Sequence, residues 1–200
     1  MAEARRLGVM GGTFDPVHHG HLVTAEEARW RFRLDEVVFV PTGQPWMKAD
    51  RDVSPADSRL GMVEAAISTN PAFSVSRVDI DRVGPTYTVD TLRALGAERG
   101  MGWDLFFITG ADAMLEILKW KDPGDVLALA HVIAATRPGY DLAAFEAGAP
   151  TQHPRVSVLD VPALTISSTD IRERVRDGRP IRYLVPEEVR AYIEEAGLYR

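Results

Sequence analysis

Cysteine is absent from the 200 residues of this sequence, and no apolar run is long enough to cross a membrane. The missing thiol excludes disulfide bonds, cysteine-ligated zinc and a cysteine nucleophile. The short apolar run after Arg5 and Arg6 is also too brief for a secretory signal. We therefore expect a cytoplasmic protein that does not associate with membranes.

The sequence also lacks long blocks of one charge sign. Its 29 acidic and 23 basic residues are well mixed and give a formal net charge of −6. Non-specific nucleic-acid binding usually needs a basic surface, so we expect no nucleic-acid partner. A small anionic ligand is still compatible with this charge, because a few arginines and lysines can reverse the potential inside one cleft.

Short apolar runs alternate with amphipathic segments along the chain, which predicts strands separated by helices. The predicted strands are Leu7–Met10, Val37–Val40, Phe73–Ile80, Leu105–Thr109, His131–Thr136 and Val156–Val161. The predicted helices are His21–Arg33, Pro55–Asn70 with Ser54 as N-cap, Thr88–Arg99, Ala111–Lys119, Pro123–Ala130, Ser167–Asp177 and Pro186–Gly197. This order predicts an α/β fold, a Rossmann-like open and mostly parallel sheet with helices on both faces. We expect one domain over residues 1–200, with a small helical C-terminal appendage from about 167 to 200.

The stretch GGTFDPVHHGH, Gly11–His21, follows the first predicted strand and leads into the first predicted helix. In an open parallel sheet, ligands bind outside the carboxyl ends of the strands. Glycines let the backbone approach a ligand closely, and a helix start favours an anion. His18 and His21 are three residues apart, so both can face the same side. The stretch therefore predicts a phosphate site, although it matches neither the P-loop nor the dinucleotide fingerprint.

Simpler interpretations of these histidines exist. A histidine near a helix start is often a cap or a surface residue, and we expect His19 to be exposed and uninvolved. A pair three residues apart can also be half of a metal site. However, no further cluster in the sequence offers an obvious third ligand.

A second motif, ISSTDIRERV, covers Ile166–Val175. Its simplest interpretation is a helix start, with Ser167 as N-cap, Asp170 in the first turn and arginines in solvent. The same groups can also hold an anion. Hydroxyl and backbone N–H groups bind phosphate oxygens, and Arg172 can clamp them from one turn further along.

Together, GGTFDPVHHGH and ISSTDIR resemble the HxGH nucleotidyltransferase superfamily. Four further stretches, DEVVFVPTGQPWMK, VSRVDIDRVGPTYTVDTL, FFITGADAMLEILKW and RPGY, make the chain similar to bacterial nicotinate-mononucleotide adenylyltransferases. The resemblance implies transfer of AMP from ATP to nicotinate mononucleotide, giving deamido-NAD and pyrophosphate by in-line attack without a covalent intermediate. It implies Mg²⁺ held by the ATP phosphates rather than by protein side chains. It is also compatible with a homo-oligomer.

The resemblance further implies roles for individual residues. The implied catalytic residues are His18, His21 and Arg172. The implied ATP-binding residues are Gly11, Gly12, Thr13, Phe14, Gly20, Gly110, Asp112, Ser167, Ser168 and Thr169. The implied residues for nicotinate mononucleotide are Lys48, Thr86, Tyr87, Thr88, Trp120, Lys121 and Arg137. Trp120 would stack on the pyridine ring, and the backbone N–H groups of Thr88 and Lys121 would meet its carboxylate. Many members of the family have tyrosine at the position of Lys121, and Arg59 is a further candidate cation for phosphate.

Three alternative functions remain at this stage. Another nucleotidyltransferase, such as the phosphopantetheine enzyme, would share both phosphate motifs, whereas GPTYTVDTL and GADAMLEILKW favour the nicotinate substrate. A regulator that has lost catalysis should lack one histidine or the arginine, and this chain keeps them all. A metal-binding module built on His18 and His21 should bind metal tightly without nucleotide.

Overall fold

The computed structural model describes residues 4–44, 53–136, 153–162 and 164–200. The strands are β1 (Arg5–Gly12), β2 (Glu36–Pro41), β3 (Phe73–Val75), β4 (Trp103–Gly110), β5 (Ala130–Thr136) and β6 (Val156–Asp160). The helices are α1 (His19–Phe32), α2 (Ala56–Ile67), α3 (Thr88–Arg99), α4 (Ala111–Leu115), α5 (Pro123–Leu129), α7 (Ser168–Arg176) and α8 (Glu187–Glu195), with a 3₁₀ turn at Ile117–Lys119.

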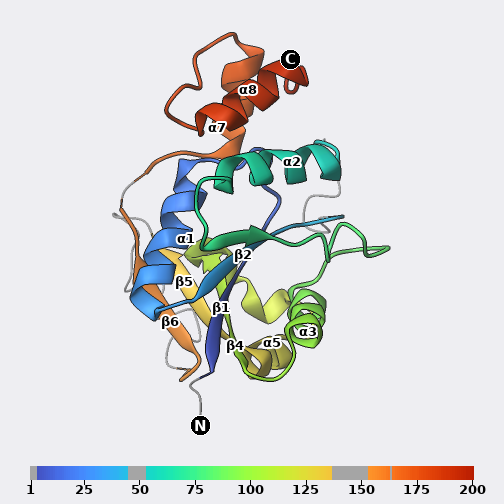
Figure 1. Cartoon of the computed structure of the whole chain (residues 1–200), viewed down its shortest axis with the longest axis vertical. Coiled ribbons are helices and arrows are strands. Elements are labelled where there is room, and N and C mark those ends of the chain that lie inside the picture. The colour runs from blue at the N-terminus through green and yellow to red at the C-terminus, as the bar shows by residue number, and fades with distance from the viewer. Residues whose placement is uncertain (1–3, 45–52, 137–152, 163) are drawn as a thin grey trace.

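The six strands form one sheet in the order β3-β2-β1-β4-β5-β6 (Figure 1). Every pair of neighbouring strands is parallel, which confirms the predicted Rossmann-like α/β fold. The chain first builds the sheet outward from β1 toward β3 and then returns to the other side of β1 with β4. Connections therefore leave β1 and β4 in opposite directions, and such a reversal opens a crevice at the carboxyl ends of the two strands.

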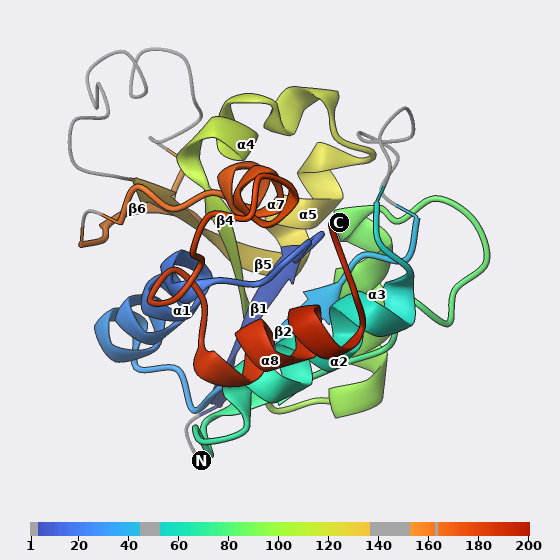
Figure 2. The same cartoon turned by 90° about the horizontal axis from the view of Figure 1, so that it is seen from above.

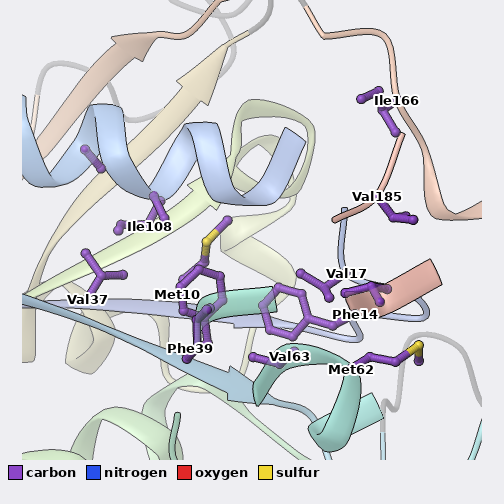
Figure 3. Packing of buried hydrophobic residues seen from close by; sticks show 14 of the residues in the cluster. Met10, Phe14, Val17, Val37, Phe39, Met62, Val63, Ile108, Ile166 and Val185 are labelled. Atoms are coloured by element: carbon purple, nitrogen blue, oxygen red, sulfur yellow. The ribbon is translucent and has the colours of Figure 1, made fainter. Parts of the chain in front are cut away.

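Alternate residues of the central strands face two apolar layers. Met10 and Phe39 join α1, α2, α7 and α8 on one face, whereas Val9 and Val38 join α3, α4 and α5 on the other. Figure 3 shows Met10, Phe39 and Phe14 packed between α1 and α2. Because both faces are covered, the strands are apolar on both sides, as buried parallel strands usually are.

The last two helices lie beyond the carboxyl edge of the sheet (Figure 1). From above, α8 runs beside α2 (Figure 2). Gly61 makes this close approach possible, since a Cβ there would lie 2.8 Å from the Tyr192 ring. Ile171 and Val189 belong to the same apolar cluster as the sheet residues, which favours the predicted single domain.

Several element predictions were wrong in extent, among them the helix predicted over Ala111–Lys119, which ends at Leu115 and is followed by the 3₁₀ turn. The strand predicted over Phe73–Ile80 ends at Val75, because the next residues turn away from the sheet and bury Asp79. The helix predicted from Pro55 to Asn70 spans Ala56–Ile67 instead, with Pro55 as its N-cap. Ser54 lies one residue before the N-cap position and does not cap the helix; its backbone N–H donates to Asp15 of the distant β1–α1 turn. Among the described helices, none is both long and apolar enough to traverse a bilayer.

Candidate functional site

A cavity of about 440 Å³ lies at the carboxyl ends of β1, β4 and β5, where the strand order reverses. This is the place at which open α/β sheets bind ligands, and the volume suits a nucleotide-sized molecule. Most of the predicted site residues line it. These are Gly11, Gly12, Thr13, His18, Gly20, His21, Thr86, Tyr87, Thr88, Gly110, Trp120 and Lys121.

The two histidines stand together at the start of α1. Their rings stack with centroids 3.8 Å apart, and His18 is the N-cap residue. The backbone N–H of His18 donates to Nδ1 of His21 over 3.2 Å. Since Nδ1 accepts this bond, a neutral His21 carries its proton on Nε2, where it can donate to a ligand. Gly20 permits the arrangement, because a Cβ there would lie 3.0 Å from the His18 ring.

The turn between β1 and α1 is fixed from three distant parts of the chain. The Asp15 carboxylate accepts bonds from the Tyr199 hydroxyl at 2.7 Å and from the Ser54 N–H at 3.2 Å. The Asp15 carbonyl accepts from the Arg172 guanidinium at 2.7 Å. The Pro16 carbonyl accepts from the Ser168 hydroxyl at 2.9 Å. These contacts hold the backbone that leads directly into His18.

The second motif therefore lies against the first, but its residues do not line the cavity. Ser167 caps α7 as predicted, because its hydroxyl accepts the Asp170 N–H. The Thr169 hydroxyl accepts a hydrogen bond of 3.4 Å from the Arg172 guanidinium. Another nitrogen of that guanidinium donates to the Asp15 carbonyl. The ATP-binding roles of Ser167, Ser168 and Thr169 and the catalytic role of Arg172 stay predictions.

Two other predicted ATP-binding residues are also outside the cavity lining. The Phe14 side chain is only 2% exposed and packs in the core against Phe39. Its ring also meets His21 edge-on, with centroids 5.1 Å apart, so it supports the histidine from below. Asp112 is exposed in the first turn of α4. Lys48 and Arg137 lie outside the described residues.

Arg59 is not the additional phosphate cation that we expected. Its side chain is 1% exposed and donates to three backbone carbonyls, those of Ser54, Thr13 and Gly43. Burial lowers the pKa of this guanidinium, and the nearby Asp15 carboxylate opposes that shift. The buried cation ties the glycine-rich turn to the segment before α2.

The far end of the cavity holds the predicted pyridine-binding residues. Trp120 meets Phe107 edge-on, with ring centroids 5.8 Å apart. The Lys121 ammonium lies 2.9 Å from the Asp90 carboxylate and 4.9 Å from the centre of the Tyr87 ring. Its charge is therefore already balanced by Asp90, which weakens any attraction of the ammonium for a substrate carboxylate.

Thr86 and Asp79 add polar atoms to the same end. The Thr86 hydroxyl is buried and has no hydrogen-bond partner among the described residues, so a ligand can supply one. Asp79, which the sequence analysis did not single out, lines the cavity and is 2% exposed. It accepts bonds of 2.8 Å from Arg82 and from Thr91, while burial raises the pKa of its carboxyl. In the sequence it lies inside VSRVDIDRVGPTYTVDTL and near the end of the predicted strand Phe73–Ile80, so no pattern marked it as a site residue.

The opposite wall of the cavity is mostly apolar. It includes four residues that sequence reasoning missed, Ala135, Val161, Pro162 and Leu164. Such a wall suits a flat aromatic ring. Within the described residues, no group of three or more histidine or acidic side chains is arranged to hold a metal ion.

Comparison with known proteins gives consistent matches. The cytidylyltransferase-like family model matches residues 9–174. A probable nicotinate-nucleotide adenylyltransferase of Acidothermus cellulolyticus is 57% identical over 98% of this chain and 94% of its own length. The protein of the same description from Streptomyces coelicolor is 59% identical over 96% of this chain and 99% of its own. The fold matches Plasmodium falciparum nicotinic acid mononucleotide adenylyltransferase complexed with NaAD, with a TM-score of 0.79 and 18% identity over 98% of this chain and 97% of that one.

Proposed function

Because this chain belongs to the cytidylyltransferase-like family, and within it to the nicotinate-nucleotide adenylyltransferases, we propose that its cavity aligns two phosphates for direct in-line transfer. The enzyme transfers the adenylyl group of ATP to nicotinate mononucleotide, yielding deamido-NAD and pyrophosphate in NAD biosynthesis. The observation that carries the mechanism is the stacked pair of His18 and His21 at the floor of the cavity.

In the proposed step, a phosphate oxygen of nicotinate mononucleotide attacks the α-phosphorus of ATP. A new P–O bond forms as the bond to the α,β-bridging oxygen breaks, and pyrophosphate leaves with that electron pair. The attacking phosphate is already an anion, so no general base is needed. The protein must position the phosphates and stabilise their charge.

His21 is proposed to supply much of that stabilisation. Its Nδ1 is engaged by the His18 N–H, so Nε2–H is its donor toward phosphate oxygens. The start of α1 adds partial positive charge at the same place. His18 packs behind His21 and keeps its ring in this orientation. Mg²⁺ enters as part of the MgATP substrate.

The two ends of the cavity are proposed to take different bases. The adenine end lies near Gly110 and the apolar wall of Ala135, Val161 and Leu164. The pyridine end lies at Thr86, Tyr87, Thr88, Trp120 and Lys121. The backbone N–H of Thr88, at the start of α3, and that of Lys121 would receive the carboxylate. The family resemblance is the basis for proposing further contacts with the phosphates and nucleotides. These are made by Lys48, Arg137, Asp112 and the second motif.

The test is pyrophosphate release from MgATP with three acceptors: nicotinate mononucleotide, nicotinamide mononucleotide and phosphopantetheine. We expect release with the first, much less with the others, and a loss of about a hundredfold in kcat for His21→Ala. His19→Ala is the matched control from the same motif, since His19 does not line the cavity. Equal kcat/KM for the acid and the amide would contradict the proposed pyridine site. An active His21→Ala variant would contradict the proposed mechanism.

A further inference from the structure

The residue before the last one, Tyr199, contacts the β1–α1 turn although 184 positions separate it from Asp15. After α8 the chain reverses, with positive φ at Gly197 and Tyr199. It then returns toward the carboxyl end of β1, where Figure 2 shows the C-terminus. The Tyr199 ring is partly buried against the main apolar cluster, and its hydroxyl also lies 3.8 Å from the sulfur of Met62.

Tyr199 donates its hydrogen bond to a carboxylate, that of Asp15, which is almost fully buried. Asp15 is 4% exposed, and a carboxylate with so little water needs hydrogen-bond donors from the protein. Tyr199 supplies one to Oδ1, and the Ser54 backbone supplies one to Oδ2. Burial and the Asp15 carboxylate together raise the pKa of Tyr199, so the phenol stays protonated and remains a donor.

Asp15 is also three residues before His18. Its carbonyl is held by Arg172, and the next carbonyl, that of Pro16, is held by Ser168. The turn is thus fixed on its backbone by α7 and on its side chain by Tyr199. A shift of this turn would move the His18 N–H, which is the group that orients Nδ1 of His21.

We propose that Tyr199 is a positioning residue for the adenylyl transfer, acting through Asp15 to hold the turn that presents His18 and His21. The proposal rests on the proposed function of that site. Tyr199 is not among the residues lining the cavity, so its effect reaches the substrate only through the turn. Small displacements of positioned donors lower the rate of the chemical step much more than they weaken binding of the ground state.

The experiment compares Tyr199→Phe with Tyr192→Phe. Both variants remove one hydroxyl from the C-terminal segment and keep the ring, but the Tyr192 ring lies against Gly61 of α2. Pyrophosphate release is measured with MgATP and nicotinate mononucleotide each varied at a saturating concentration of the other, well below each variant's melting temperature. We expect kcat to fall about tenfold in Tyr199→Phe with both KM values within about twofold of the wild type. Tyr192→Phe should keep the wild-type kcat.

A purely structural role predicts a different pattern. Tyr199→Phe would then melt at a lower temperature but turn over at the wild-type rate while folded, and that result overturns the proposal. An equal loss of kcat in Tyr192→Phe overturns it too. If the wild type itself releases no pyrophosphate with nicotinate mononucleotide, the proposed function fails. Wild-type activity combined with an unaffected Tyr199→Phe variant refutes the positioning role alone.

Discussion

At the scale of single residues, the site depends on two histidines that are close in sequence and on an arginine whose partners are distant. The three-residue interval between His18 and His21 predicted that both rings face one side, and they stack. Arg59 was wrongly predicted to bind phosphate because its hydrogen-bond partners are distant in sequence. Two of its three carbonyl acceptors, those of Thr13 and Gly43, lie 46 and 16 positions away. The sequence around an arginine does not predict partners at such separations.

Lys121 carries a prediction at this scale. The ammonium pairs with Asp90, so replacing Lys121 with Met leaves a negative charge near the proposed position of the substrate carboxylate. We expect KM for nicotinate mononucleotide to rise by less than about fivefold, since the pair is partly exposed and screened and Arg93 also lies 3.6 Å from Asp90. The measurement is steady-state kinetics with varied acceptor.

The matched control is the double variant Lys121→Met/Asp90→Asn, which removes both charges. We expect its KM to return to within about twofold of the wild type, because backbone N–H groups are the proposed carboxylate ligands. If the KM of the double variant were as high as that of Lys121→Met, the Lys121 ammonium itself would be what attracts the substrate carboxylate.

At the scale of elements, α3 shows what periodicity can predict. Thr88–Arg99 was predicted with the observed bounds, because its apolar face and its glycine stop are local signals. The strand predicted over Phe73–Ile80 was too long, because Val75 and Val78 among polar residues gave the whole stretch strand character. The chain instead turns after Val75, where Asp79 accepts from Arg82 three residues on and from Thr91 of α3, and the contact with α3 depends on the tertiary fold.

Two glycines test how closely the elements pack. A Cβ at Gly8 of β1 would lie 2.8 Å from Leu34 and 3.1 Å from Val37, both core side chains. Gly8→Ala should therefore lower the free energy of unfolding by about 1–3 kcal/mol. A Cβ at Gly96 of α3 would lie at an ordinary 3.8 Å from Leu105, its nearest neighbour outside the helix. Gly96→Ala should raise the free energy by about 0.5–1 kcal/mol through helix propensity.

Urea unfolding at constant pH measures both variants. We expect the urea midpoint to fall in Gly8→Ala and to rise in Gly96→Ala. The dependence of the free energy of unfolding on urea concentration should be the same in both variants. An unchanged free energy of unfolding in Gly8→Ala would mean that Leu34 and Val37 repack without cost. That result would contradict tight packing around the central strand.

At the scale of the whole molecule, the order of apolar and amphipathic segments was enough to predict the fold class. The placement of α7 against the β1–α1 turn was not, because it rests on bonds such as that from Arg172 to Asp15, 157 positions apart. The second motif was therefore predicted to face the ligand. In the structure its hydroxyl and guanidinium groups first hold the turn.

Global stability should depend on pH through His131 of β5. Its Nε2 lies 2.8 Å from the Ser157 hydroxyl of β6, and its ring lies among Phe32 and Phe106. Burial, with a smaller effect of Arg155, lowers its pKa below the ordinary 6.5. As the pH falls below 6.5, the unfolded chain binds a proton that the folded protein resists, so the free energy of unfolding decreases.

His131→Asn should flatten this dependence between pH 7 and pH 5, measured by urea unfolding across that range. Ser157→Ala is the control, because it removes the hydrogen bond but keeps the titrating ring. It should lower stability at every pH and retain the slope. The same slope in His131→Asn as in the wild type would assign the acid sensitivity to other groups.

The bond between Asp15 and Tyr199 has a consequence for protein synthesis. Tyr199 is synthesised 184 residues after Asp15. A nascent chain can pair β1 with β2 and β4 before then, but its histidine turn lacks the tyrosine. Copies that stop short of Tyr199 would therefore bring the two substrates together with an incompletely held turn, and full turnover would begin only after this tyrosine has emerged.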